Sequence, residues 1–480
     1  MHLGTGDMPH GWAAAQYVHL HRNCLVFENN DNLDLRWRVQ PNWQRRLTHM
    51  SRSKVLRTLR SSVLPSLIAF SFLLATGCKT PQQKISVNKQ SSPYTIWPSE
   101  PPAGCPFQNS KEITGIGFTG KHVHYAHADT WYPSWAANGN LYSPWTDGRV
   151  DDAHSNSAGP HATTGYATIL GDDPLKLTVV DPGVYPGNPA PYGGRYPCGS
   201  LVYNGVWYYG TYCLMDSDGN PGKGLNWDIL GPFVGFRYST DYGRTWHDTP
   251  HTPLHPLFPE PKKPGDKLKI GSPHFVDFGK NMEYSPDGKA YLVGQGAVDP
   301  DPKPRPANLS WITGDQIYMV RVKPSIRNMN DRSEYEYFSG LDASGRPVWT
   351  HDFSKIRPLV DWNNNCGCVT MTYDAPLKKY LMCITDGGNT ISRFNTYILE
   401  SEQMTGPWKL VDYMRHFGEQ GYFVNIPSKF ISKDGRTAWL CYAANFTNGY
   451  LHTNYRSNPP GGGYGMTLQQ IRLLAPGEQQ

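Results

Sequence analysis

One pattern returns five times in this chain of 480 residues: a short strand, a tight turn, and a second strand that carries an aromatic side chain. It constrains the fold more than any other feature of the sequence. The five units open at residues that lie 69, 76, 92 and 59 positions apart, namely Asp129, Cys198, His274, Cys366 and Asn425. Four of the turns contain Asn-Gly or Asp-Gly, at 138–139, 204–205, 287–288 and 434–435. Such pairs are the strongest short hairpin signals, because both central residues of the turn take positive φ.

Repeats of this kind predict an all-β fold in which each small sheet buries its faces only against its neighbours, as in a β-propeller. Five units predict five blades. Six blades are the alternative if the 92-residue gap contains a further unit. We expect a single domain over residues 106–480, because large all-β folds often run long as one domain.

A second motif is the octapeptide Ser239–Trp246, which reads Ser-Thr-Asp-Tyr-Gly-Arg-Thr-Trp. It matches in full the Asp-box, S-x-D-x-G-x-T-W, of sialidase-like propellers. This resemblance implies a turn between the two outer strands of a blade, with the Trp packed between blades, and it implies no catalytic role. The segment Gly406-Pro407-Trp408 similarly resembles the outer turns of the five-bladed arabinanase and fructosidase enzymes.

Residues from about 113 to 474 resemble the five-bladed propellers of family 43 glycoside hydrolases, and also a propeller family that contains endo-D-arabinanases. The shared features are the Asp that opens the first unit, the segment 278–281 and the Gly-Pro-Trp turn. The resemblance implies a glycan-cleaving enzyme. The chain departs from family 43 in one respect, since no clean Glu stands where that family's general acid would open a middle blade.

The N-terminal part is expected to serve export rather than the fold. From Met50 a basic segment is followed by the apolar run Val63–Leu74 and then by Ala75–Cys78, which is the order of a secretory signal over residues 50–77. The apolar run is too short for a transmembrane helix, which needs about 20 residues. The Cys after the final Gly resembles a bacterial lipobox, which implies lipidation of Cys78. An ordinary signal peptide with a chance Cys is the alternative.

These features predict an exported protein that is lipid-anchored to a bacterial membrane. Lys79 resembles outer-membrane sorting signals, and residues 78–105 would be the lipidated Cys and a polar tether. We interpret residues 1–49 as the product of a start set too far upstream, because they show no periodicity and would precede a signal. Residues 1–77 hold nine Lys or Arg and four Asp or Glu, which accounts for the whole net charge of +5. The neutral remainder argues against a nucleic-acid partner.

The cysteines give no sign of a metal site, because the body has no CxxC pair and no matching His spacing. We expect most of them to be buried free thiols. They are Cys105, Cys198, Cys213, Cys366, Cys368, Cys383 and Cys441. No cofactor is expected. Calcium in a central funnel is an alternative that the Asp-rich loops suggest without any ligand spacing.

The catalytic candidates lie where the repeated units open, because inner strands of all blades start at the mouth of the central funnel of a propeller. Glycoside hydrolysis normally uses two carboxyl groups, one as acid and one as base or nucleophile. Asp129 is the candidate base or nucleophile, or else a structural hydrogen-bond acceptor. Trp131 and Trp135 are candidates for stacking on a sugar. The candidate acids are Glu419 and His274, since the ordinary pKa of His, about 6.5, lies near neutral.

The other candidates would bind the substrate. Asp147 is a candidate modulator or sugar ligand, although Thr-Asp-Gly is also an ordinary turn. Three arginines would clamp a carboxylate or sulfate on an acidic sugar, because guanidinium groups suit planar anions, unless each pairs with a nearby Asp. These are Arg149, Arg195 and Arg393. The remaining candidates are Asn365, Tyr422 and Asn425.

The sequence therefore predicts a monomeric glycoside hydrolase that acts on a carbohydrate and reaches the membrane through its lipid only. Two alternatives stay open. A polysaccharide lyase would use His274, Tyr422 and Arg195 in place of a carboxyl pair. A surface glycan-binding lipoprotein would keep the aromatic residues and tolerate the loss of Asp129, since one fold hosts many unrelated activities.

Overall fold

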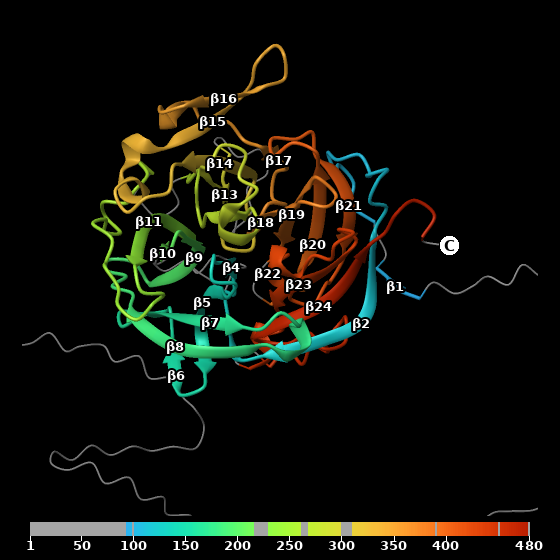
Figure 1. Cartoon of the computed structure of the whole chain (residues 1–480), viewed down its shortest axis with the longest axis horizontal. Coiled ribbons are helices and arrows are strands. Elements are labelled where there is room, and N and C mark those ends of the chain that lie inside the picture. The colour runs from blue at the N-terminus through green and yellow to red at the C-terminus, as the bar shows by residue number, and fades with distance from the viewer. Residues whose placement is uncertain are drawn as a thin grey trace, which may run out of the picture. The chain divides into compact units, whose positions relative to one another are not determined.

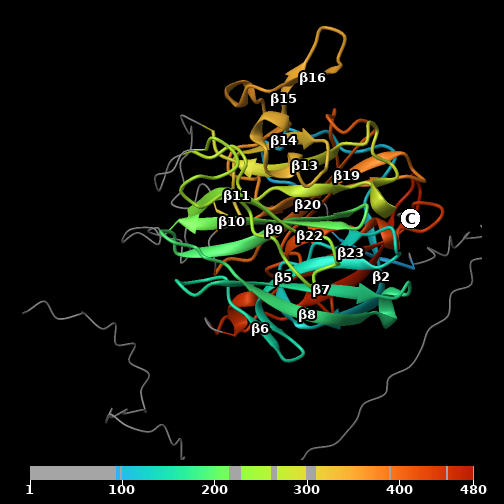
Figure 2. The same ribbon diagram turned by 60° about the vertical axis from the view of Figure 1, so that its left-hand side comes forward.

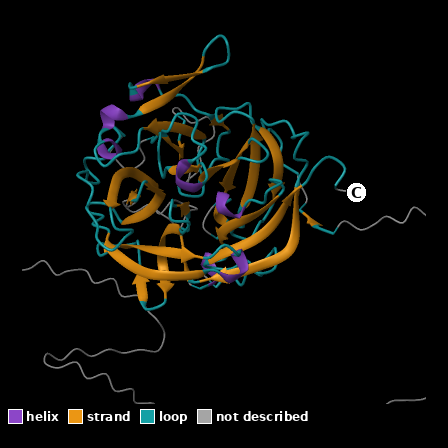
Figure 3. Cartoon of the chain, in the orientation of Figure 1, coloured by secondary structure: helices purple, strands orange, loops and turns teal. Residues whose placement is uncertain are grey.

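The computed structural model describes residues 93–97, 100–215, 229–260, 267–298, 310–388, 391–449 and 452–478. The chain divides into the units Met1–Lys84 and Ile85–Gln480, and every described residue belongs to the second unit. The predicted signal and Cys78 lie outside the described residues. Regular structure in the described part consists of strands and short 3₁₀ helices (Figure 3), which confirms the all-β prediction. The helices are Pro174–Lys176, Lys280–Met282, Asn328–Asn330, Arg332–Glu334, Phe353–Lys355, Ser428–Phe430 and Phe446–Asn448.

The first repeated unit forms a sheet in which β3, β5, β7 and β8 follow one another, while β4 and β6 also pair with β5. The strands are β3 (His127–Asp129), β4 (Ser134–Trp135), β5 (Leu141–Val150), β6 (Ala153–Ser155), β7 (Thr163–Leu170) and β8 (Thr178–Pro186). The predicted Asn-Gly turn at 138–139 lies between the paired strands β4 and β5. β5 pairs with β3, β4, β6 and β7, so it is the central strand of this sheet.

The second unit forms a sheet with the strand order β11–β10–β9. The strands are β9 (Gly194–Tyr203), β10 (Val206–Met215) and β11 (Ile229–Ser239). After β11 the octapeptide folds into a turn in which the Asp241 carboxylate accepts the N–H and the hydroxyl of Thr245, at 2.9 and 2.7 Å. Trp246 then packs against Tyr166 of the first sheet and Trp207 of the second, with ring centroids 5.2 and 5.1 Å apart. This indole therefore joins the two sheets.

The third and fourth units are linked by a short parallel pairing of β12 with β18. The third contains β12 (His274–Asp277), β13 (Ala290–Gly296), β14 (Gln316–Val322), β15 (Glu336–Leu341), β16 (Pro347–Thr350) and β17 (Val360–Asp361). The fourth contains β18 (Val369–Asp374), β19 (Lys379–Asp386), β20 (Asn395–Ser401) and β21 (Lys409–Met414). The hairpin of β15 and β16 projects from the rest of the third unit (Figures 1 and 2). The two predicted hairpins, β12–β13 and β18–β19, are both present.

The fifth unit combines the two ends of the described chain in one sheet, with the order β1–β2–β24–β23–β22. The strands are β1 (Thr95–Ile96), β2 (Ile116–Tyr125), β22 (Tyr422–Asn425), β23 (Thr437–Ala443) and β24 (Met466–Leu473). The N-terminal strand β2 runs antiparallel beside the C-terminal strand β24 (Figure 1). The fifth sheet is thus completed by residues that precede the first unit in the sequence.

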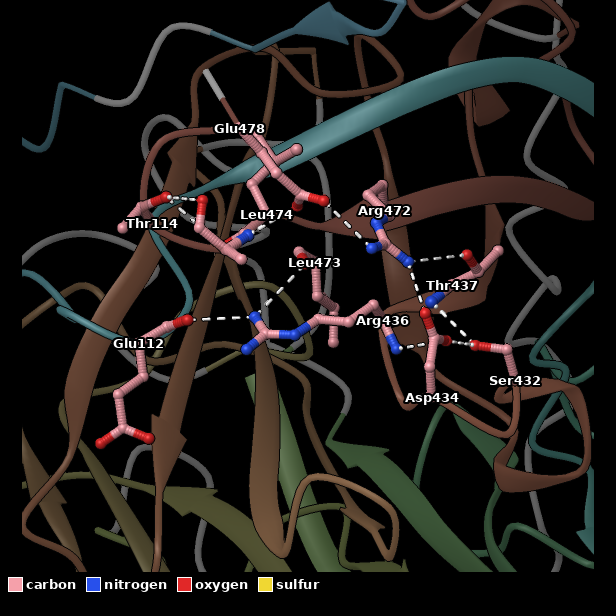
Figure 4. Close-up of polar contacts among 11 residues, drawn as sticks. Glu112, Thr114, Ser432, Asp434, Arg436, Thr437, Arg472, Leu473, Leu474 and Glu478 are labelled. Carbon is pink, nitrogen blue, oxygen red and sulfur yellow. Dashed lines mark hydrogen bonds and ion pairs between the residues drawn. The ribbon is translucent and has the colours of Figure 1, made fainter. Parts of the chain in front are cut away.

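Polar contacts fasten these two ends beside the fifth sheet (Figure 4). The Arg436 guanidinium donates a hydrogen bond to the backbone oxygen of Glu112, at 3.0 Å. Arg472 of β24 donates to the carboxylates of Asp434 and Glu478, at 2.8 and 3.0 Å. The contacts join the segment before β2, the turn before β23 and the segment after β24, so the attachment of these segments to the fifth sheet does not depend on strand pairing alone.

A buried cation fastens the same N-terminal segment to the fourth sheet. The Lys379 ammonium lies 2.9 Å from Glu112 and 3.3 Å from Glu400, and the side chain of Glu400 is almost fully buried. Glu400 also accepts a hydrogen bond from the Ser110 hydroxyl, at 2.8 Å. A buried carboxylate is tolerated only when it is paired, so Lys379 is the residue on which this contact depends.

The described cysteines are all free, and every one except the half-buried Cys105 is buried. This confirms the prediction of buried free thiols. Their neighbours are the apolar and aromatic side chains of the sheets, so they pack as small hydrophobic residues.

Candidate active site

A cavity of about 700 Å³ brings together three of the predicted site residues, Asp129, Asp147 and Tyr422. Its walls come from strands and loops of the first, second and fifth units, including the loop between β23 and β24, and from Trp311 before β14. Its volume falls within the range of about 300–1,000 Å³ that is usual for small-molecule sites. The wall also contains Thr130, Gly148, His154, Ser155, Asn156, Ala158, Tyr196, Tyr212, Trp311, Phe423, Asn445, Phe446, Asn448, Gly449, Tyr455, Ser457, Gly462, Gly463 and Tyr464.

Asp129 ends β3 and is only 8% exposed. Its carboxyl accepts hydrogen bonds from the hydroxyls of Tyr422, at 2.7 Å, and Thr130, at 2.8 Å, and it is also hydrogen-bonded to Tyr464. Burial raises the pKa of Asp129 well above its ordinary value, and the nearby charge of Asp147 raises it further. The hydroxyl donors act in the opposite direction and lower this pKa. The balance favours a protonated Asp129 when Asp147 is ionised.

Asp147 lies on the neighbouring strand, because its predecessor Thr146 pairs with Asp129 across β3 and β5. The residue after it is a glycine for a steric reason: a Cβ on Gly148 would lie 1.9 Å from the backbone oxygen of His127. The Asp147 carboxyl accepts the backbone N–H of Ser157, at 2.6 Å. Burial raises the pKa of Asp147, and this backbone N–H lowers it. Two interacting carboxyls in one cavity are the usual arrangement for dividing acid and base roles.

The backbone is strained at several residues of the cavity wall. Thr130, Asp147, Phe423 and Asn445 have φ values of 66, 49, 54 and 53°. Positive φ is uncommon for any residue with a Cβ and is a true outlier for a β-branched one such as Thr130. Strain of this kind costs about 1–3 kcal/mol per residue and tends to occur at functional sites. Its concentration around the two carboxyls indicates that this cavity is such a site.

Aromatic rings form a large part of the cavity wall. Trp311 packs against Tyr422 and Phe446, with ring centroids 5.0 and 5.5 Å apart. Tyr196 and Tyr212 supply a second pair, at 5.8 Å. Rings of this type combine a large apolar face with few polar atoms, which suits the apolar face of a sugar ring.

His274 lies outside this cavity. It is 2% exposed, its ring stacks on Tyr132 at 3.8 Å between centroids, and it lines a separate cavity of about 50 Å³. Burial lowers the pKa of His274 to about 3, so the imidazole is neutral near pH 7. Trp135 and Asn425 line the same small cavity. The structure therefore does not bring these three predicted residues together with Asp129 around one space.

Glu419 also lies outside the walls of the large cavity and forms an ion pair with Arg393. The Arg393 guanidinium lies over the ring of Tyr455, 5.4 Å from its centroid, and Tyr455 does line the cavity. The ion pair thus lies behind the cavity wall and is not part of it. For Arg393 the alternative of an arginine paired with a nearby acid holds, with Glu419 in place of an Asp.

Two more of the predicted residues, Trp131 and Arg195, have structural partners. The Trp131 indole donates to the backbone oxygen of Ala128, at 2.7 Å, within a buried cluster. Arg195 donates to the Thr211 hydroxyl and to the backbone oxygen of Gly187, both at 2.8 Å.

Arg149, Asn365 and Asn425 lie away from the walls of the large cavity. Arg149 is exposed on β5, opposite His154. The Asn365 side chain donates to its own loop, and that of Asn425 donates to Trp131. None of the three contributes to the lining around Asp129 and Asp147.

Three aromatic residues of the cavity wall were not predicted from the sequence, namely Tyr464, Trp311 and Phe446. All three lie on segments between strands rather than where a repeated unit opens. The glycine-rich stretch 461–465 around Tyr464 was the available signal, because an aromatic residue among glycines indicates a tightly packed loop. Trp311 lies outside the hairpins of the repeated units and had no comparable signal.

The described residues contain no group of three or more His, Cys, Asp or Glu side chains arranged to hold a metal ion. No helix in that part of the chain has the length and apolar character needed to cross a membrane.

The sequence matches no family profile and no curated protein. Several solved structures are distantly similar. A family 117 glycoside hydrolase from Zobellia galactanivorans is 12% identical, with a TM-score of 0.39, over 79% of this chain and 90% of its own. A GH43_1 enzyme from Xanthomonas citri is 13% identical, with a TM-score of 0.37, over 72% and 87%. An exo-1,5-α-L-arabinanase from a bovine ruminal metagenomic library is 14% identical, with a TM-score of 0.36, over 73% and 94%. Similarity of this size carries no functional argument, so function has to be argued from the residues of this chain.

Proposed function

We propose that the five units are the blades of one five-bladed β-propeller and that this propeller is a glycoside hydrolase. The blade count is supported by five hairpins of paired antiparallel strands, one in each unit. Within the described residues, the 92-residue gap between the third and fourth openings contains the hairpin of β15 and β16, which pairs with β14 and so belongs to the third unit rather than to a sixth. The pairing of β2 with β24 joins the two ends of the ring in the last blade.

The observation that carries the function is the carboxyl pair. Asp129 and Asp147 come from neighbouring strands, face one cavity and affect each other's protonation. Cleavage of a glycosidic bond normally needs one carboxylic acid to protonate the leaving oxygen and one carboxylate to activate water or attack the sugar. These two residues are the carboxyl groups in the described wall of the cavity, so the proposed site needs neither Glu419 nor His274.

The environments of the two carboxyls assign their roles. Asp129 is more strongly destabilised as an anion, because burial and the charge of Asp147 both raise its pKa. It is therefore the group that holds a proton in the resting protein and donates it to the leaving oxygen. Asp147 keeps its charge with the help of the Ser157 N–H and acts as base or nucleophile. This assignment reverses the role that the sequence suggested for Asp129.

The cavity wall favours an uncharged sugar. Its described residues include no Lys and no Arg, while two acidic residues lie at its surface. An anionic sugar would have to approach these carboxyls without a compensating cation, which is unfavourable in a partly buried site. Hydroxyl and amide side chains, for example those of Ser155, Asn156 and Asn445, are suited to hydrogen-bonding sugar hydroxyls instead.

The test is a screen of plant, algal and bacterial polysaccharides, with reducing ends and ultraviolet absorbance measured on the same samples. We expect new reducing ends with the wild-type protein and none with Asp147→Asn. Ultraviolet-absorbing, unsaturated ends would show a lyase and refute the hydrolase. Binding without any cleavage would show a glycan-binding protein.

We also propose that the protein is exported and lipid-anchored through Cys78, which the signal-like segment 50–78 supports. The measurement is incorporation of a labelled fatty acid in a bacterial host, compared with Cys78→Ser. Label in the wild type alone is expected. Equal labelling of both, or of neither, would contradict the anchor.

A further inference from the structure

Tyr464 reaches the carboxyl pair from a closely packed glycine segment just before β24. At Gly465, where φ is +151°, a Cβ would lie 2.1 Å from the backbone oxygen of Ala126, and at Gly461 it would lie 2.0 Å from the ring of His122. Only glycine allows the segment to approach so closely. The backbone oxygen of Gly463 also accepts the N–H of Ala444, at 3.0 Å. The segment is therefore held on both sides, and Tyr464 has a fixed position.

The Tyr464 hydroxyl has two acceptors within reach. It donates to the backbone oxygen of Asp147, at 2.5 Å, and it is hydrogen-bonded to the carboxyl of Asp129. A phenol has a single proton, but its oxygen can also accept a hydrogen bond. The proton can thus point fully to only one of the two groups at a time, while the phenol oxygen remains available to the other.

We propose that Tyr464 is a positioning residue that serves Asp129 in both of its protonation states. When Asp129 is ionised, the Tyr464 hydroxyl donates to it. When Asp129 is protonated, its O–H donates to the phenol oxygen and the phenol donates to the backbone oxygen of Asp147. The inference rests on the proposed function, because a general acid has to pass between these two states during the reaction.

The other groups around Asp129 do not provide this exchange. The titratable ones are Asp147, Tyr422, Tyr132, Tyr212 and Cys368. Burial raises the pKa of the tyrosines and of the thiol, so near pH 7 they keep their protons and Asp147 is the one neighbour that carries charge. Tyr422 lies on β22 in the buried core and donates to Asp129, at 2.7 Å. Tyr464 combines such a contact with a second acceptor on the opposite strand.

The test is an infrared titration of the full-length protein that follows the carbonyl band of protonated Asp129. The band is assigned by its loss in Asp129→Asn. Tyr464→Phe keeps the ring and removes the hydroxyl. We expect the midpoint to rise by about one pH unit, because a hydrogen bond to an ionised carboxylate is roughly twice as strong as one to a neutral acid. An unchanged midpoint would overturn the proposal.

Tyr455→Phe is the matched control. Tyr455 lines the same cavity, but its hydroxyl donates to the backbone oxygen of Ile391. We expect its Asp129 midpoint to equal that of the wild type, and an equal shift in both variants would overturn a specific role for Tyr464.

A second measurement needs no variant to fold. In wild-type protein with isotope-labelled tyrosine, the phenol C–O band of Tyr464 is expected to shift at the same pH as the Asp129 carboxyl band, and a band that stays constant would overturn the exchange. Neither titration uses a substrate. Shifts in a protein that cleaves no glycan would therefore support the exchange and refute the hydrolase.

Discussion

Asp129→Asn is expected to change the pH dependence of stability, because it removes a carboxyl whose pKa is raised by folding. The folded-state pKa of Asp129 lies above its ordinary value of 3.8 through burial and the charge of Asp147. The folded protein therefore binds this proton more tightly than the unfolded chain does. The stabilisation is complete at a pH below the unfolded pKa and is lost as the pH rises through the folded pKa. Wild-type protein should lose this contribution at high pH, and the variant should not.

The magnitude follows from the rise in pKa. Each pH unit by which folding raises the pKa of Asp129 costs wild-type protein about 1.36 kcal/mol once the pH exceeds the folded pKa. The substitution Asp129→Asn also changes the hydrogen bonds that this side chain makes with Tyr422 and Thr130. The comparison of two pH values removes the part of this change that does not depend on titration, and what remains reports the titration of the interacting pair Asp129 and Asp147.

The assay is urea unfolding near pH 5 and near pH 9 of wild-type protein, of Asp129→Asn and of the exposed control Asp152→Asn. Between the two conditions, Asp129→Asn should gain at least about 1.4 kcal/mol relative to wild type, while Asp152→Asn should gain almost nothing. A difference between wild type and Asp129→Asn that is independent of pH would refute the reasoning that burial and Asp147 raise this pKa.

Three further predictions concern the charge of the substrate, the buried ion pair of Lys379 and Glu400, and the role of Asp129 in the reaction. On a glycan found by the screen, sulfated or uronate-bearing forms should be cleaved at least about tenfold less efficiently than uncharged ones, measured as kcat/KM, and faster cleavage of the charged form would contradict the proposed wall chemistry. Lys379→Met should lower the free energy of unfolding by about 3 kcal/mol in urea, because Glu400 becomes a buried unpaired charge, whereas exposed Lys433→Met should change it by less than about 0.5 kcal/mol. An equal effect of both would show that the buried pair is unimportant. Asp129→Asn should retain far more activity on aryl glycosides with good leaving groups than on the natural glycan, because such groups leave without a proton; equal loss on both would instead make Asp129 the base or nucleophile.

The sequence predicted the hairpins well because their signals are local. The Asn-Gly pair at 204–205 lies between β9 and β10, and its glycine has φ of +80°. The same local reasoning selected Asp129 and Asp147, which are 18 positions apart in the sequence and lie on paired strands. Tyr422 required only the expectation that the openings of different units meet.

The places of the other candidate residues depend on how deeply each side chain is buried and on which way it points. The repeat in the sequence encodes neither. His274 opens its unit as Asp129 does, but its ring turns against Tyr132 and is sealed from the large cavity. Glu419 lies near the opening of the fifth unit, yet its carboxylate turns to Arg393. Tyr464 lies on the loop between β23 and β24, and this loop is not part of the repeated pattern. Each outcome is set by packing between distant segments, so periodicity could not predict it.

The most direct test of the central claim is the release of reducing ends from the best glycan of the screen by wild-type protein, Asp129→Asn, Asp147→Asn and Asp152→Asn. The proposed carboxyl pair predicts at least about a hundredfold loss of rate for the first two variants and a wild-type rate for the exposed control. Wild-type rates in either Asp129→Asn or Asp147→Asn would contradict the assignment of this cavity as the site of hydrolysis.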